Sequence, residues 1–165
     1  MKNYLLVLLL TVFLFACEEV VKPDADISDG PKVSAVDAQT SPVSYDLNAI
    51  NDPNSVLAKR VIYFDYDSSK VDNEYLDLIK HHGKYLAANP DVEIRLESHT
   101  DERGTREYNV ALADRRGKAV QRLLVFQGAS SGQIIMISYG EEKPASLGHD
   151  SSAWSLNRRA ELIYQ

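Results

Sequence analysis

The chain has 165 residues, a formal net charge of −6 at neutral pH and a single cysteine. One cysteine excludes an internal disulfide. The sequence has no stripe of basic residues of the kind that binds phosphate backbones, so we expect no nucleic-acid partner.

Residues 1–16 are typical of a secretory signal. Lys2 is followed by an apolar run from Tyr4 to Ala16, shorter than the roughly 20 residues that a membrane span needs. The run ends in Leu-Phe-Ala-Cys, like the lipobox at which bacteria attach lipid. An odd cysteine in a secreted protein needs an explanation, so we predict lipid on Cys17. An ordinary signal peptide with an incidental cysteine is the alternative.

A disordered acidic tether is predicted for residues 17–55, because this stretch holds several prolines, many polar residues and few large apolar side chains. The remaining residues, 56–165, suffice for one compact domain. Nothing after Cys17 resembles a transmembrane segment, so lipid would anchor the protein to a membrane without spanning it.

The first half of the domain is expected to contain two strands and a helix. The segment 60–67 is rich in Val, Ile, Tyr and Phe and is predicted to be a strand. Residues 91–99 alternate between apolar and charged side chains, which predicts a strand with one buried face. The pattern between them, 72–89, is helical and ends at Asn-Pro. Its predicted buried stripe comprises Leu76, Ile79, Gly83 and Leu86.

In the second half, Thr105 is a suitable N-cap for a helix that ends near Gly128. Residues 133–139 are apolar on both faces, which favours a central strand. A loop over 140–157 then leads to a last strand, 158–164. The order β-α-β-α-β-β predicts an α+β domain with two main helices packed on one face of a mixed four-stranded sheet.

Arg116 lies on the predicted buried stripe of the second helix. At about 100° per residue, Arg116 and Asn109 fall on the same side as Leu112. A buried guanidinium needs a partner. The candidates are Asp101 and Glu102 in the loop that enters the helix, or the carboxylate of a ligand, which arginine binds in a bidentate manner.

The junction between this loop and the helix combines the Asp101 carboxylate, the Arg116 guanidinium and free backbone N–H groups near Thr105. Such a combination suits a zwitterion better than a simple anion. The alternative is an internal Asp101–Arg116 ion pair that only fixes the loop to the helix.

The sequence supports catalysis and metal binding less well than it supports a binding site at this junction. His99 stands in the same loop, but no serine or cysteine nucleophile lies in a recognisable motif. His81 and His82 point in different directions on a helix, and His149 has no second histidine at metal-ligand spacing. We therefore predict neither an enzyme nor a bound metal or cofactor, and assign His99 a structural role, bonded within the loop.

Two other features have ordinary explanations. Asp65 and Asp67 share a face at the end of a strand, where turn or cap chemistry explains them better than a catalytic pair. Trp154 is either a core residue or part of a partner surface.

Four stretches of the chain resemble the OmpA-like peptidoglycan-binding domain family, and within it the peptidoglycan-associated lipoproteins. They are VIYFDYDSS, ESHTDERGTREYNVALADRRGKAV, ISYGEEKPASLGHD and NRRAEL, and the resemblance covers Val61 to Tyr164. It implies the same fold and a site for the meso-diaminopimelate of peptidoglycan stem peptides, whose side chain ends in a carboxylate and an ammonium group.

The resemblance also implies roles for residues. Arg116 and loop N–H groups would bind the carboxylate, and Asp101 the ammonium. Asn109 would support the loop, and Arg158 would line the same cleft. The full predicted site consists of Thr100, Asp101, Glu102, Asn109, Arg116 and Arg158.

The location and partners implied are those of an outer-membrane lipoprotein whose domain lies in the periplasm. It would bind peptidoglycan and TolB, with other Tol or OmpA-like proteins as further partners, and act in envelope integrity and cell division. A lipoprotein that binds only proteins and a hydrolase of the cell wall are the alternatives.

Three positions depart from the family pattern. Ser98 stands where the family has glycine, and it would be strained if the position needs a positive φ. Ala113 and Gly117 replace a serine and an alanine beside Arg116, and Gly117 lowers helix stability by about 1 kcal/mol. We expect the loop to accommodate Ser98.

Overall fold

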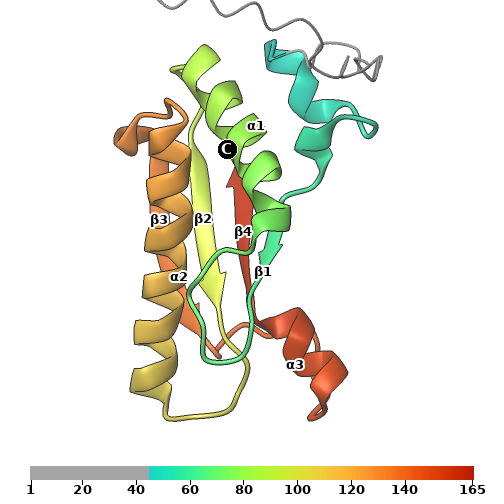
Figure 1. The fold of residues 1–165 in the computed structure, drawn as a ribbon, viewed down its shortest axis with the longest axis vertical. Helices are drawn as coiled ribbons and strands as arrows, with labels where there is room; N and C mark the ends of the chain where they lie inside the picture. The colour runs from blue at the N-terminus through green and yellow to red at the C-terminus, as the bar shows by residue number, and fades with distance from the viewer. Residues whose placement is uncertain (1–44) are drawn as a thin grey trace, which may run out of the picture. The chain divides into compact units, whose positions relative to one another are not determined.

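The structure, a computed structural model, describes residues 45–165. The predicted signal peptide, Cys17 and most of the predicted tether lie outside this range. The four strands form one sheet in the order β1-β4-β2-β3, with β2 and β3 parallel and the other neighbours antiparallel (Figure 1). They are β1 (Val61–Tyr63), β2 (Ile94–His99), β3 (Ile134–Gly140) and β4 (Arg159–Tyr164).

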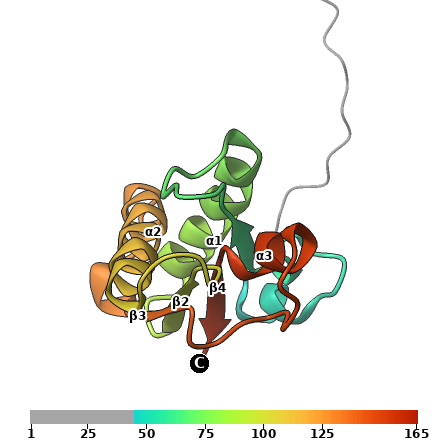
Figure 2. The same ribbon diagram turned by 90° about the horizontal axis from the view of Figure 1, so that it is seen from below.

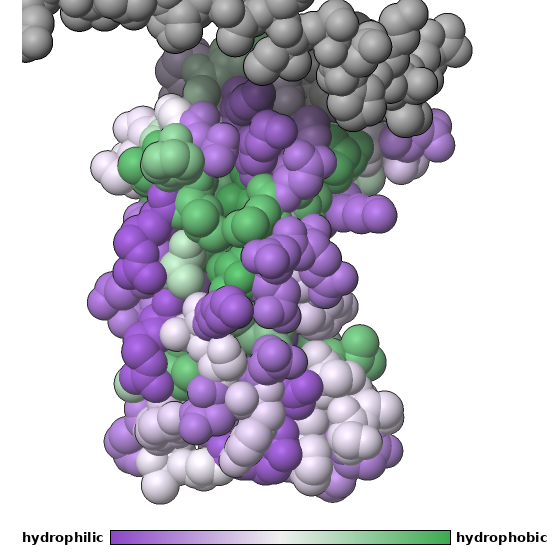
Figure 3. All heavy atoms as spheres, viewed as in Figure 1, coloured by the Kyte–Doolittle hydropathy of each residue, from purple (hydrophilic) through white to green (hydrophobic). Residues whose placement is uncertain are grey.

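Two long helices, α1 (Leu76–Ala88) and α2 (Arg106–Phe126), cover one face of this sheet (Figure 2). The core lies between the two layers, where Ile79 and Leu124 of the helices meet Leu96 and Leu162 of the sheet, all almost fully buried. Seen from the helix side, apolar residues gather between the helices in the upper half, whereas the lower end is mostly hydrophilic (Figure 3). The predicted α+β class is confirmed.

The extent of the first helix was predicted well, but one residue of its predicted buried stripe is exposed. Ile79, Gly83 and Leu86 are buried, whereas Leu76 is 42% exposed and does not belong to the buried stripe. Gly83 allows close approach to α2, since a Cβ there would lie 2.5 Å from the Cβ of Gln127.

The second helix begins and ends as predicted. The Thr105 hydroxyl accepts a hydrogen bond from the Tyr108 amide at 3.2 Å, and Gly128 follows the last turn with φ of 109°. A positive φ at this position is the usual reason for glycine after a helix C-terminus.

The prediction that 133–139 forms a central strand was wrong. Within the described residues, β3 lies at the edge of the sheet and has β2 as its single neighbour. Although its sequence is apolar on both faces, one face packs against α2, while the other carries Ile135, which is 47% exposed. β1 is also shorter than the predicted strand 60–67.

A third helix, α3 (Ser151–Asn157), stands where a loop was predicted over 140–157. The carboxylate of Asp150 caps it by accepting a hydrogen bond from the Ala153 amide at 2.9 Å. With seven residues, this helix is too short to show a clear period in the sequence.

The folded part of the chain starts before residue 56, which corrects the predicted end of the tether. Residues 47–51 and 56–58 form short 3-10 helices that pack on α1. Leu57 is fully buried against Tyr85, whose hydroxyl donates to the Leu47 carbonyl at 3.1 Å. Residues 45–55 therefore belong to the domain.

In the described part of the chain, no helix is both long and apolar enough to cross a membrane.

Candidate functional site

A small cavity of about 110 Å³ opens at the end of the domain where β2 leads into α2. The loop after β1, the loop 100–105 and the start of β4 meet here, at the lower end of Figure 1. Of the predicted site, every residue except Glu102 lines the cavity. The complete lining is Tyr66, Asp67, Thr100, Asp101, Arg103, Gly104, Tyr108, Asn109, Leu112, Arg116 and Arg158.

Arg116 is fully buried, as the helical pattern predicted, but its partners are backbone carbonyls. Its guanidinium donates to the carbonyl oxygens of Ser68 at 2.8 Å, His99 at 2.8 Å and Asp65 at 3.0 Å. Among the described ion pairs, Asp101 is bonded by other arginines instead. The alternative of an internal Asp101–Arg116 pair is therefore wrong.

The charge of Arg116 is poorly solvated. Burial, followed by repulsion from Arg158, lowers the pKa of Arg116 to about 10, so the side chain still carries its positive charge at neutral pH. A guanidinium has more N–H donors than these three carbonyls use, and Arg116 lines the cavity. It can therefore present positive charge to an anion bound there.

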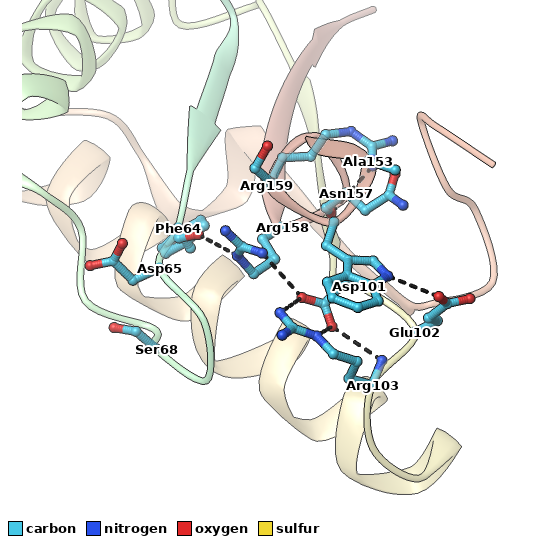
Figure 4. A network of polar contacts seen from close by, with 12 residues as sticks. Phe64, Asp65, Ser68, Asp101, Glu102, Arg103, Ala153, Asn157, Arg158 and Arg159 are labelled. Carbon is cyan, nitrogen blue, oxygen red and sulfur yellow. Dashed lines mark hydrogen bonds and ion pairs between the residues drawn. The ribbon is translucent and has the colours of Figure 1, made fainter. Parts of the chain in front are cut away.

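Asp101 is only 3% exposed and is held by two arginines (Figure 4). Its Oδ2 accepts from Arg103 Nη2 at 2.7 Å and from Arg158 Nη1 at 3.3 Å, and its Oδ1 accepts from Arg103 Nε at 3.2 Å. Burial would raise the pKa of Asp101, but the hydrogen bonds from Arg103 and Arg158 outweigh it and lower that pKa. Asp101 is thus an ionised carboxylate at neutral pH.

Arg103 lies between two aromatic rings. Its guanidinium carbon is 3.9 Å from the ring centre of Tyr66 and 4.2 Å from that of Trp154. Neither Arg103 nor Tyr66 was predicted as a site residue, and the role of Trp154 was left open. The only sequence signal was the position of Arg103, two residues after Asp101.

Glu102 does not line the cavity, so the structure does not bring it together with the other predicted site residues. Its carboxylate bonds His149 Nδ1 at 2.7 Å and accepts from Trp154 Nε1 at 2.8 Å. It lines a separate hollow of about 360 Å³ between the loop 100–105 and the segment 141–149. Its role here is to position Trp154.

Thr100 and Asn109 support the loop. The Thr100 amide donates to the Gly140 carbonyl at 2.8 Å, which joins the loop to the end of β3. Asn109, only 1% exposed, donates through its side-chain amide to the Glu141 carboxylate. The predicted burial of Asn109 is confirmed.

Asp67 is a further charged residue on the cavity wall. Its φ of 53° lies in the left-handed region, which a non-glycine residue adopts only when the surrounding structure stabilises it. The hydroxyl of Tyr108 donates to its carboxylate. Sequence reasoning assigned Asp67 to turn chemistry and missed its place in the wall of the cavity that Asp101 also lines.

His99 is buried and stacked on Tyr139, with ring centres 5.4 Å apart. Burial, followed by the charge of Arg159, lowers the pKa of His99 to about 4. Among the described residues, neither ring nitrogen has a partner in full hydrogen-bonding geometry, and the backbone group that acts on the ring, that of Lys143, lies outside the loop 100–105. The expectation that His99 is bonded within the loop was therefore wrong. No cluster suited to a metal ion occurs among residues 45–165.

The fold and the cavity define a small α+β binding domain with paired opposite charges at its site. Residues 63–158 match the model of the OmpA family, and the chain belongs to this family. It is a family of binding domains and not of enzymes.

Among curated proteins, the chain is 47% identical over 114 residues to the peptidoglycan-associated lipoprotein of Pseudomonas aeruginosa, covering 69% of this chain and 67% of that protein. It is 48% identical over 103 residues to that of Pasteurella multocida, covering 62% and 69%.

Among solved structures, the peptidoglycan-associated lipoprotein of Burkholderia pseudomallei matches with a TM-score of 0.69 and 49% identity, over 70% of this chain and 98% of that one. The C-terminal domain of Helicobacter pylori MotB matches with a TM-score of 0.60 at 21% identity, over 65% and 84%, and shares the fold.

Proposed function

We propose that the protein is an outer-membrane lipoprotein that attaches the membrane to peptidoglycan, and that the cavity binds the side-chain end of meso-diaminopimelate. The observation that carries the proposal is the composition of the cavity wall. Arg116 and Arg158 lie beside Asp101 and Asp67 around one small space. A group with a carboxylate and an ammonium on one carbon meets both charges there.

The two ends of this zwitterion have different partners. The carboxylate faces Arg116 and Arg158, whose guanidinium groups are fixed by hydrogen bonds to backbone carbonyls. The ammonium faces the carboxylate of Asp101, with that of Asp67 on the adjoining wall. Because these charges lie in a partly desolvated site, their attraction for the ligand exceeds that of surface charges.

The layout of the domain supports a tethering role. The segment 45–58, through which the chain enters the domain, lies at the upper end in Figure 1, and the loop 100–105 at the lower end. The chain that leads to a lipid on Cys17 and a ligand in the cavity would therefore be attached at opposite ends of the domain. The relatives named peptidoglycan-associated lipoproteins support both attachments.

From the sequence resemblance alone, we extend the proposal to the Tol system, with TolB as a protein partner and a role in cell division. Envelope extracts from cells that express the chain should yield TolB with it. Absence of TolB under conditions that retain the lipoprotein would contradict this part alone.

Calorimetric titration of the detergent-solubilised full chain with an alanyl-glutamyl-meso-diaminopimelate tripeptide tests the cavity. We expect Asp101→Asn to weaken binding by about thirtyfold or more, since a buried charged contact is lost. The lysine tripeptide, which lacks the second carboxylate, should bind more weakly than the diaminopimelate tripeptide. Equal affinities in both comparisons would exclude the proposed site.

A further inference from the structure

The carboxylate that is proposed to accept the ligand ammonium already has cationic partners. Arg103 forms two side-chain hydrogen bonds with Asp101, and Arg158 forms a third. The Arg103 amide adds another at 3.1 Å. With its oxygens so engaged and only 3% of its surface exposed, Asp101 has little capacity for a further cation unless one of the arginines leaves.

The three arginines of the cavity differ in how firmly they are held. Arg116 donates to three backbone carbonyls, and Arg158 Nε donates to the Phe64 carbonyl at 2.9 Å. Within residues 45–165, the side-chain hydrogen bonds of Arg103 all go to Asp101, and the side chain is 33% exposed. Arg103 can therefore leave without breaking a bond to the backbone.

The surroundings of the Arg103 guanidinium suit organic cations in general. The ring centres of Tyr66 and Trp154 lie 3.9 and 4.2 Å from the guanidinium carbon, and the Asp101 carboxylate accepts a hydrogen bond from Nη2. Aromatic faces together with a carboxylate bind ammonium as well as guanidinium groups. Trp154 is held in place through its hydrogen bond to Glu102.

We propose that Tyr66, Trp154 and Asp101 form a cation cage, that Arg103 occupies this cage while the ligand site is empty, and that the primary ammonium of a ligand exchanges with it. The inference rests on the proposed function, because it takes the ligand to be a zwitterion. Arg103 is then a selectivity residue. A ligand with an ammonium alone must displace Arg103 without the gain that its missing carboxylate would have from Arg116 and Arg158.

Removing the competitor should strengthen binding. We expect Arg103→Ala to bind the diaminopimelate tripeptide about tenfold more tightly than the wild type, as follows if about one tenth of the wild-type molecules have an open cage. The lysine tripeptide should gain at least as much. An analogue with 2-aminopimelate, which keeps the carboxylate but lacks the side-chain amine, should gain nothing.

Two variants control for other effects. Arg103→Lys keeps a cation that reaches Asp101 but stacks less well on the rings, so its affinity should lie between those of the wild type and Arg103→Ala. In the Arg103→Ala background, where the competitor is absent, Tyr66→Leu removes one wall at a position that is 60% exposed and should weaken binding of the amine-bearing peptides only.

The wild type offers a readout that needs no variant. Trp154 is the only tryptophan of the chain, so its fluorescence reports on the cage. The amine-bearing tripeptide should change this fluorescence and shift the NMR signal of the Arg103 Nε–H group, and the amine-free analogue should do neither.

Weaker or unchanged binding by Arg103→Ala, or an unmoved Arg103 signal in a wild type that binds, would overturn the exchange and leave the proposed function standing. Absence of heat with every peptide and every variant would overturn the proposed function itself.

Discussion

A Cβ atom added to Gly117 in α2 would lie 2.7 Å from the Oγ of Ser98 in β2. At both positions the sequence resemblance implies another residue, glycine in place of Ser98 and alanine in place of Gly117. Ser98 is fully buried, and Asp67 is the only non-glycine residue with positive φ in the described chain, so Ser98 is not strained. The two departures compensate each other, because the serine occupies space that the helix leaves free.

This relationship predicts that Gly117→Ala destabilises the domain, although alanine favours a helix by about 1 kcal/mol. The new methyl would also meet Met136 Sδ at 3.0 Å. Overpacking of this kind costs about 1–3 kcal/mol. In urea unfolding, the single variant should therefore lose stability.

Ser98→Ala provides the matched background. It removes the Oγ, which has no hydrogen-bond partner among residues 45–165, and should itself be close to neutral. In this background, Gly117→Ala should be neutral or stabilising, with a coupling of about 1 kcal/mol or more. A Gly117→Ala variant that is equally tolerated with and without Ser98 would contradict the compensation.

The buried His82 predicts a loss of stability in mild acid. Its ring nitrogens bond the Tyr164 hydroxyl and the Lys59 carbonyl, both at 2.7 Å, and burial lowers its pKa from 6.5 to about 4. Below pH 6.5 the unfolded chain takes up a proton that the folded chain does not. The free energy of unfolding should therefore fall by about 3 kcal/mol between pH 6.5 and 4.

His82→Gln tests this assignment. The variant should be less stable than the wild type at pH 7 but should lose less stability on acidification. His99 contributes in the same direction, so part of the slope remains. Parallel stability curves for the wild type and the variant, measured by urea unfolding from pH 7 to 4, would refute the role of His82.

The burial of Arg116 and Asn109 could be predicted from the sequence, because the helical period alone determines which residues share a face. The partners of Arg116 could not be. They are backbone carbonyls at positions such as Ser68, supplied by a loop that folds against the helix. Every residue has a backbone carbonyl, so the residue types do not indicate which carbonyls bond the guanidinium. The acids nearby in the chain were therefore chosen as partners instead.

The predictions of the strand order and of the short helix α3 were wrong for a related reason. The apolar sequence of β3 indicates two apolar faces but not which neighbours pair with its edges. Trp154 reaches Arg103 only because α3 forms, and that helix rests on the cap at Asp150 and has no hydrophobic period. For this reason the place of Trp154 in the site could not be predicted from the sequence.

The segment before β1 offers a test of the corrected domain boundary. Leu57→Ala should lower the free energy of unfolding by about 2–5 kcal/mol, because Leu57 is fully buried. Leu47→Ala, in the same segment but 62% exposed, should change it by less than about 0.5 kcal/mol. Equal effects of the two substitutions in urea unfolding would mean that the segment is a tether after all.

Arg116→Ala should destabilise the domain by about 3 kcal/mol or more, since three backbone carbonyls, that of His99 fully buried, lose a charged donor. Its neighbour Arg115 is exposed, so Arg115→Ala should change stability by less than about 0.5 kcal/mol and serves as the control. Urea unfolding of both variants measures the difference. If Arg116→Ala proves as stable as the control, its carbonyl contacts do not hold the loops. If the expected loss is found, weaker ligand binding by this variant reports on the fold as well as on the site, and Asp101→Asn becomes the decisive variant for the ligand.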